Sequence, residues 1–87
     1  MSEQAAPTAS VQSLARGLAV ISSFDAEHAS MTLSEVAART NLSRATARRF
    51  LLTLVDLGYV RTDGKHFELT SKVLQLGYAY LSSATLP

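Results

Sequence analysis

The sequence contains no cysteine and no tryptophan among its 87 residues. The absence of thiols excludes disulfide bonds, zinc sites built on thiolates and cysteine nucleophiles. The two histidines, His28 and His66, lie far apart in the sequence, so no metal site is expected. No carboxylate pair, nucleophile constellation or glycine-rich phosphate loop is visible either, and we predict neither an enzymatic activity nor a cofactor.

Long hydrophobic runs are also lacking. The longest uninterrupted apolar stretches, such as Leu18–Ile21, are far shorter than the ~20 residues that a membrane-spanning helix needs. The N-terminus does not show a basic stretch followed by an apolar one, which is the pattern of a secretory signal. The sequence therefore predicts a cytoplasmic protein with no membrane contact.

Charged residues are scarce, at 17% of the chain, whereas hydrophobic residues make up 47%. This balance predicts a folded domain with some apolar surface left for another domain or subunit. The net charge is only +1, but four of the eight Lys and Arg residues lie between positions 39 and 49, where no acid occurs. This cluster, consisting of Arg39, Arg44, Arg48 and Arg49, indicates a directed contact with an anionic partner.

Helical spacing of apolar residues marks both ends of the sequence. It predicts a helix over 11–24 with Ser10 as its N-cap, and a last helix over 72–83 capped by Thr70 or Ser71. The last helix is apolar on most sides, so we expect part of it to pack against a partner. The apolar stripe of the first helix consists of Val11, Leu14, Ala15, Leu18, Ile21 and Phe24.

The middle of the sequence predicts two further helices joined by a tight turn. Thr32 and Glu35 form a capping box at the start of the first of these helices. Asn41 suits a left-handed turn position, because Asn tolerates a positive φ better than most residues. Ser43 then caps a helix over 44–57.

Gly58 ends that helix, and two short strands follow at 59–62 and 65–69. The Asp63-Gly64 pair between them is a hairpin turn signal. The order helix, helix, helix, hairpin, helix predicts a winged helix-turn-helix, which is a mainly α fold with a small β-hairpin.

In such a fold the second helix of the motif enters the major groove, with its N-terminal turns facing the base edges. The exposed residues on these turns of the predicted helix are Arg44, Ala45, Arg48 and Arg49, with Thr46 near the edge. Arginine forks pair with guanine edges or with phosphates, and the helix end capped by Ser43 also favours a phosphate. A solvated basic face is the simpler interpretation, but the lack of neighbouring acids favours double-stranded DNA.

These segments together resemble the IclR family of bacterial transcription regulators. The resemblance extends over 11–84 and is carried by the segments Val11–Leu18, Thr32–Ala37, Leu42–Leu51, Gly58–Val60 and Leu69–Thr70. Two runs, ARRFLL at 47–52 and LGYAYL at 76–81, are similar to the branch that regulates protocatechuate and 4-hydroxybenzoate catabolism.

The resemblance implies a sequence-specific DNA-binding domain of an effector-responsive regulator. Members of the family bind operators as dimers or pairs of dimers, and they carry a larger C-terminal domain for a small effector. We therefore expect a flexible tail at 1–10, the winged helix-turn-helix at 11–70, and at 71–87 a linker helix toward an effector domain that this sequence does not contain. The expected partners are a palindromic operator and a second copy of the chain.

Arg44 and Arg48 are predicted to read base sequence, because they vary among family members. Arg49 resembles a commonly basic family position and is predicted to contact a phosphate or a base. Its alternative is a salt bridge to Asp56 or Glu35.

The other predicted DNA contacts each have a structural alternative. Arg39 either contacts DNA or stabilises the end of its helix through the helix dipole. Arg16 either reaches the DNA backbone, forms a dimer contact or makes a salt bridge at the edge of the core. Arg61 and Lys65 flank the hairpin tip, where a wing follows the minor groove or backbone. Thr46 either donates to a phosphate or bonds within its own helix.

The first and last helices have more apolar surface than a single small domain covers. We predict a homodimer interface at Val11, Leu14, Leu18, Leu76, Tyr78, Tyr80 and Leu81. A winged-helix module for protein–protein assembly is the alternative function, which would explain these two helices but not the exposed arginines. Salt-dependent binding to duplex DNA distinguishes the two.

Overall fold

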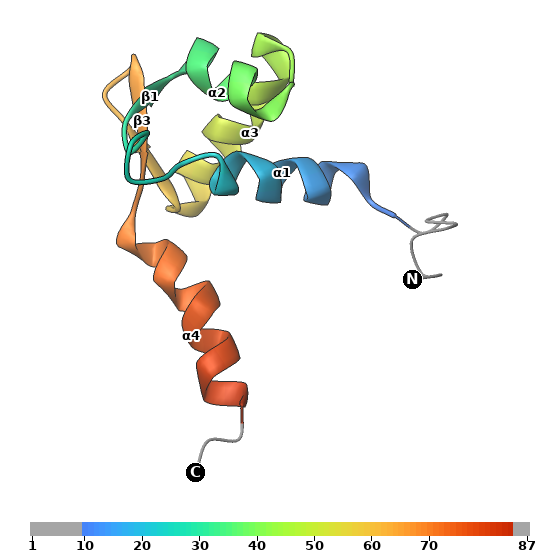
Figure 1. Cartoon of the computed structure of the whole chain (residues 1–87), viewed down its shortest axis with the longest axis vertical. Coiled ribbons are helices and arrows are strands. Elements are labelled where there is room, and N and C mark those ends of the chain that lie inside the picture. The colour runs from blue at the N-terminus through green and yellow to red at the C-terminus, as the bar shows by residue number, and fades with distance from the viewer. Residues whose placement is uncertain (1–9, 85–87) are drawn as a thin grey trace.

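The computed structural model describes residues 10–84 and has the predicted winged helix-turn-helix architecture (Figure 1). The elements are α1 (Gln12–Ser22), β1 (Met31–Thr32), α2 (Leu33–Thr40), α3 (Arg44–Leu57), β2 (Val60–Thr62), β3 (His66–Leu69), the 3₁₀ turn η2 (Ser71–Val73) and α4 (Leu74–Ser83). Helices dominate, and the strands form one small antiparallel sheet, which confirms the predicted fold class. The predicted tail lies outside the described residues except for Ser10.

The helix-turn-helix has the caps that the sequence predicts. Thr32 Oγ1 accepts from the Glu35 amide at 3.3 Å, and Glu35 Oε1 accepts from the Thr32 amide at 2.8 Å. Asn41 ends α2 in the left-handed region, with φ of 58°. Ser43 Oγ then accepts from the Thr46 amide at 3.1 Å and starts α3. Because each helix end is fixed locally, the turn holds α3 at a defined angle to α2.

The sheet contains one strand more than the sequence suggests. β2 and β3 form the predicted hairpin, with Val60 opposite Leu69 and Thr62 opposite Phe67. β1 adds to the other edge of β3, with Met31 opposite Phe67, so that the strand order is β1-β3-β2. A strand of two residues shows no alternation that sequence inspection can detect.

The core lies between α1, α2, α3 and the sheet. Its buried residues are Val20, Phe24, Met31, Val36, Ala37, Ala47, Leu51, Leu54, Val60 and Phe67. The core face of α1 differs from the prediction, because Val20 is the buried residue of this helix and most of the predicted stripe is exposed. The predicted Ser10 cap is also wrong, since Val11 occupies the N-cap position and no side chain bonds there.

Helix α4 extends away from the rest of the domain (Figure 1). Thr70 caps the turn η2, which precedes α4, so that the α-helix begins two residues later than predicted. None of the residues of α4 is buried, and none belongs to the core described above. The domain is therefore complete without α4.

Candidate nucleic-acid interface

Arg44 and Arg48 lie on one face of α3, one turn apart, and face the tip of the hairpin. A cleft of about 420 Å³ separates them from the hairpin, and it is lined by Thr32, Leu33, Ser34, Arg44, Arg48, Gly64, Lys65 and Phe67. Three of these side chains are cationic and none is a carboxylate. The cleft therefore concentrates positive potential between the N-terminal turn of α3 and the hairpin.

Arg49 is exposed on α3 and does not line this cleft. The predicted alternative, a salt bridge to Asp56 or Glu35, is not formed. The carboxylate of Glu35 bonds instead to the amide of Thr32. Among the described residues, Arg44, Arg48 and Arg49 have no ion-pair partner, so all three guanidinium groups are available to an external anion.

Ser43, Ala45 and Thr46 surround the N-terminal turn of α3. The Ser43 hydroxyl caps the helix and also donates to Thr46 Oγ1 at 2.9 Å. The Thr46 hydroxyl keeps its own proton for a further acceptor. Ala45 is exposed and leaves room for close approach of a DNA backbone or base.

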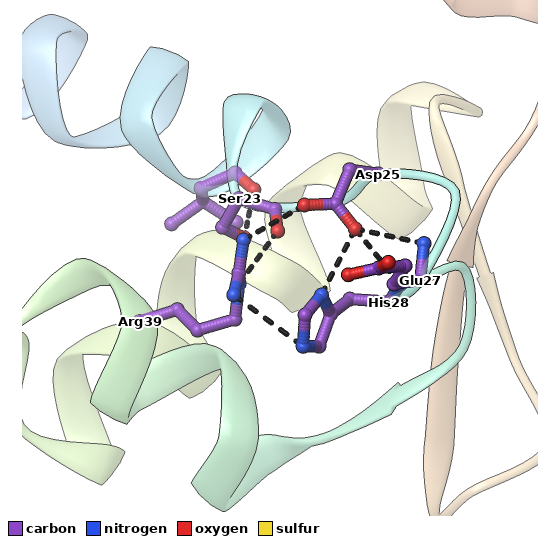
Figure 2. Close-up of polar contacts among 6 residues, drawn as sticks. Ser23, Asp25, Glu27, His28 and Arg39 are labelled. Atoms are coloured by element: carbon purple, nitrogen blue, oxygen red, sulfur yellow. Dashed lines mark hydrogen bonds and ion pairs between the residues drawn. The ribbon is translucent and has the colours of Figure 1, made fainter.

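Arg39 takes part in a network within the protein (Figure 2). Its Nε donates to the Ser23 carbonyl at 2.9 Å, and its Nη2 donates to Asp25 Oδ2 at 3.0 Å. Its Nη1 lies 3.4 Å from Nε2 of His28, whose Nδ1 lies 2.9 Å from Asp25 Oδ1. Arg39 therefore ties the end of α1 to α2, which is a structural role different from the helix-dipole alternative that the sequence suggested.

The carboxylate of Asp25 is the centre of that network. The hydrogen bond from His28 holds the pKa of Asp25 below its ordinary value, and the amide of Glu27 and the charge of Arg39 act in the same direction. Sequence reasoning missed this site. The only signal was an acid, Asp25, three residues before a histidine, His28, and that pattern is too common to predict a contact with Arg39.

The hairpin contributes one free cation and one paired cation. Arg61 on β2 donates to Glu68 on β3 at 2.9 Å, and both side chains are exposed. Lys65 lines the cleft with the arginines of α3 and has no ion-pair partner among the described residues. Asp63 accepts from the amides of Lys65 and His66, which shapes the tip and lowers the pKa of Asp63. Of the two predicted hairpin contacts, Lys65 is thus the better placed.

Arg16 is exposed on α1, away from the cleft, and makes no ion pair with another described residue. The salt bridge at the core edge, one of its predicted alternatives, is therefore not formed within residues 10–84.

The predicted interface residues on the outer helices are all exposed. The fractional exposure ranges from 50% to 71%, and the residues are Val11, Leu14, Leu18, Leu76, Tyr78, Tyr80 and Leu81. On α1 they border a groove of about 440 Å³ against α3, which is lined by Ser13, Leu14, Gly17, Leu18, Ile21, Phe50 and Thr53. The groove lining has no charged residue.

A helix-turn-helix followed by a wing, with free arginines on the outward turns of its second helix, defines a winged helix-turn-helix DNA-binding domain. The family model of the IclR helix-turn-helix domain matches residues 13–64. The chain therefore belongs to the IclR family and contains its DNA-binding domain.

The relatives of the chain are regulators of transcription. The chain is 50% identical over 74 residues to the Pca regulon regulatory protein of Pseudomonas putida, an alignment that covers 85% of this chain and 25% of the relative. It is 46% identical over 77 residues to the p-hydroxybenzoate hydroxylase transcriptional activator of Acinetobacter baylyi, covering 88% and 28%. These relatives are not enzymes, in agreement with the sequence analysis.

A crystal structure described as a transcriptional regulator of Rhodococcus sp. RHA1 has the same fold. It matches with a TM-score of 0.81 and 68% sequence identity, covering 90% of this chain and 31% of that one. The chain thus spans about a quarter to a third of the length of the relatives that it matches.

Residues 10–84 contain no helix that is long and apolar enough to cross a membrane. The same residues contain no group of three or more His, Asp or Glu side chains that could hold a metal ion.

Proposed function

We propose that this chain binds a specific duplex operator through α3 and the wing, as the DNA-binding part of an effector-responsive regulator of aromatic-compound catabolism. The observation that carries the proposal is the cleft where Arg44, Arg48 and Lys65 converge with no carboxylate in its lining. The names of the Pseudomonas and Acinetobacter relatives support the aromatic-compound assignment. In this proposal the small-molecule effector binds a larger C-terminal domain, and the protein acts in the cytoplasm.

Within this interface we assign base reading to Arg44 and Arg48 and backbone contact to Arg49, Lys65 and the Ser43 end of α3. The guanidinium groups of Arg44 and Arg48 lie on the face of α3 that the cleft exposes. Arg49 lies around the helix from them, where phosphates flank a helix inserted in the major groove. Arg16, Thr46 and Arg61 are secondary candidates: Arg16 lies on α1, Thr46 accepts from the Ser43 hydroxyl, and Arg61 is paired with Glu68.

The test of the proposal separates base reading from charge. The chain selects its operator from a random duplex library, and binding is then measured on that duplex and on its single-base-pair variants. Arg48→Ala should weaken binding by about 1–3 kcal/mol and relax the preference at one base pair, whereas Arg49→Ala should weaken all sequences alike. Arg48→Lys is the matched control, since it keeps the charge and loses the bidentate fork.

Two results would contradict these assignments. A uniform loss over all operator variants for Arg48→Ala would remove its base-reading role. A protein that neutralises DNA phosphates releases counterions, so its affinity falls steeply as the salt concentration rises. An affinity that does not fall in this way would exclude DNA as the partner.

We further propose that two copies of the chain pair through α1 and α4 and bind half-sites related by a two-fold axis. The exposed leucines and tyrosines of these helices and the uncharged groove beside α1 support a second copy as the partner. Pairing doubles the contact with DNA and predicts half-sites roughly one helical turn apart, ~34 Å, or a multiple of it.

Sedimentation tests the pairing. The weight-average mass should rise with concentration, and Leu18→Glu should abolish that rise, because it places a charge on the apolar face of α1. Leu52→Glu is the matched control, since Leu52 is 37% exposed on α3 outside the groove lining. A strictly monomeric chain that saturates a palindromic operator as one independent copy per half-site would refute pairing by this domain.

A further inference from the structure

The C-terminal end of α3 is fixed by two sets of contacts. The first is local: the Gly58 amide donates to the Val55 carbonyl at 3.0 Å, and the Tyr59 amide donates to the Leu54 carbonyl at 2.9 Å. These two bonds form a Schellman motif, which satisfies two of the carbonyls that a helix end leaves open. The Leu57 carbonyl, at the last residue of α3, is not satisfied by this motif.

The second set comes from the segment that leads into α4. Lys72 Nζ donates to the Leu57 carbonyl at 2.7 Å and lies 5.0 Å from the centre of the Tyr59 ring. Thr70 Oγ1 donates to the Gly58 carbonyl at 2.6 Å, and the Thr70 amide donates to the Tyr59 carbonyl at 2.9 Å. We call these five residues, Leu57, Gly58, Tyr59, Thr70 and Lys72, the α3–η2 clasp.

The ammonium group of Lys72 lies at the C-terminal end of α3, where a positive charge is stabilising. An ammonium group at a helix C-terminus interacts favourably with the helix dipole, and the Tyr59 ring adds a cation–π contact. The stem of Lys72 passes close to Gly58, where an added Cβ would lie 3.3 Å from Lys72 Cδ. Gly58 thus serves both the left-handed turn, at φ of 92°, and the approach of Lys72.

The clasp lies at the start of the rod formed by η2 and α4. Val73 and Leu74, at the junction, both have right-handed helical backbone angles, so the turn continues directly into the helix. No residue of α4 is buried within the described chain, so packing against the domain does not hold its direction (Figure 1). Among the described residues, the hydrogen bonds of the clasp join the start of this rod to the end of α3 and to Tyr59.

We propose that Lys72 is a positioning residue that fixes the angle between the recognition helix α3 and the outgoing helix α4. A displacement of α4 then acts on the last turn of α3 through the Leu57 carbonyl. This inference rests on the proposed function only in taking α3 as the helix that reads DNA. The angle itself is a property of the chain without DNA, so it can be measured independently.

Paired spin labels measure that angle. Because the chain has no cysteine, Thr53→Cys on α3 and Ser82→Cys on α4 give two unique labelling sites. Labelled chain is diluted with unlabelled chain so that only distances within one copy are recorded by pulsed electron paramagnetic resonance. The parent should give one narrow distance distribution.

The variants decide the role of Lys72. Lys72→Met keeps the stem and removes the ammonium group, and it should replace the narrow peak by a broad distribution. Lys72→Arg should retain the narrow peak, and Lys65→Met is the matched control that should not change it. Thr70→Val, which loses the bond to Gly58, should broaden the peak independently.

A narrow, unshifted peak in Lys72→Met would overturn the proposal, whatever the result for Thr70→Val. Circular dichroism of each variant verifies that the helices are intact, so that broadening reports the angle and not unfolding. If the clasp variants behave as expected but the chain does not bind DNA, the proposed function fails and the positioning role of Lys72 stands.

Discussion

Helices α3 and α4 both carry apolar side chains at helical spacing, but the chain buries only those of α3. Ala47, Leu51 and Leu54 of α3 lie in the core, whereas Leu76 and Tyr78 of α4 are at least half exposed. An apolar pattern at helical spacing therefore does not by itself show that the described chain buries that face. In this molecule the core covers the apolar stripe of α3, whereas the apolar side chains of α4 and of the outer face of α1 are exposed.

The largest expected effect separates these two kinds of leucine. Leu54→Ala should lower the free energy of unfolding by roughly 2–5 kcal/mol, because it leaves a cavity under a side chain that is 8% exposed. The matched substitution Leu76→Ala should change it by less than about 0.5 kcal/mol at concentrations where the chain is monomeric. Urea unfolding followed by circular dichroism measures both. Equal losses would show that α4 packs on the domain in solution.

A pair of glycines sharpens the same comparison. Gly58→Ala should cost about 1–2 kcal/mol, since Gly58 has φ of 92° and a side chain there is strained. Gly77→Ala in α4 should instead favour the helix by about 0.5–1 kcal/mol, because no atom lies within 4 Å of the added Cβ.

The two glycine variants need different measurements. Urea unfolding reports the loss for Gly58→Ala, and the helical signal of the folded chain reports the gain for Gly77→Ala. A gain in unfolding free energy for Gly77→Ala as large as the loss for Gly58→Ala would mean that α4 unfolds together with the core.

The helix-turn-helix could be predicted from sequence because its signals are local. The capping box of Thr32 and Glu35, the left-handed Asn41 and the Ser43 cap each depend on residues within one turn of the chain. The exposure of Arg44, Arg48 and Arg49 could be predicted in the same way, since it depends on the stripe that α3 buries.

The features that could not be predicted from the sequence depend on contacts between residues far apart in the chain. Arg39 bonds to Asp25 across 14 positions, and Lys72 bonds to Leu57 across 15. Neither pair leaves a pattern in the sequence. The face that α1 buries was also wrongly predicted, because Leu14 and Leu18 of the predicted stripe are exposed and Val20 lies in the core.

The smallest expected effect is a dependence of stability on pH, which comes from three exposed carboxylates of the domain that precedes α4. The pKa of Asp25 is lowered by its hydrogen bond with His28, that of Glu35 by the amide of Thr32, and that of Asp63 by the amide of His66. A carboxyl group whose pKa is lower in the folded state stabilises folding when ionised. That stability is complete above the unfolded pKa, about 3.9 for aspartate, and is lost as the pH falls through the folded value.

Asp25→Asn should therefore be less stable than the parent at neutral pH, and the difference should shrink from about pH 5 downward. The melting temperature measured against pH gives the difference curve. Asp56→Asn is the matched control for the removal of one carboxylate, because Asp56 has no ion-pair partner among the described residues. Helix α4 contains no carboxylate, so Gly77→Ala should raise the helical signal equally at both ends of this pH range.

The contradicting result is a difference in melting temperature between Asp25→Asn and the parent that stays constant with pH. It would mean that the charge of Asp25 does not stabilise the contact between the end of α1 and α2. The hydrogen bonds of Asp25 would then act equally well through an amide.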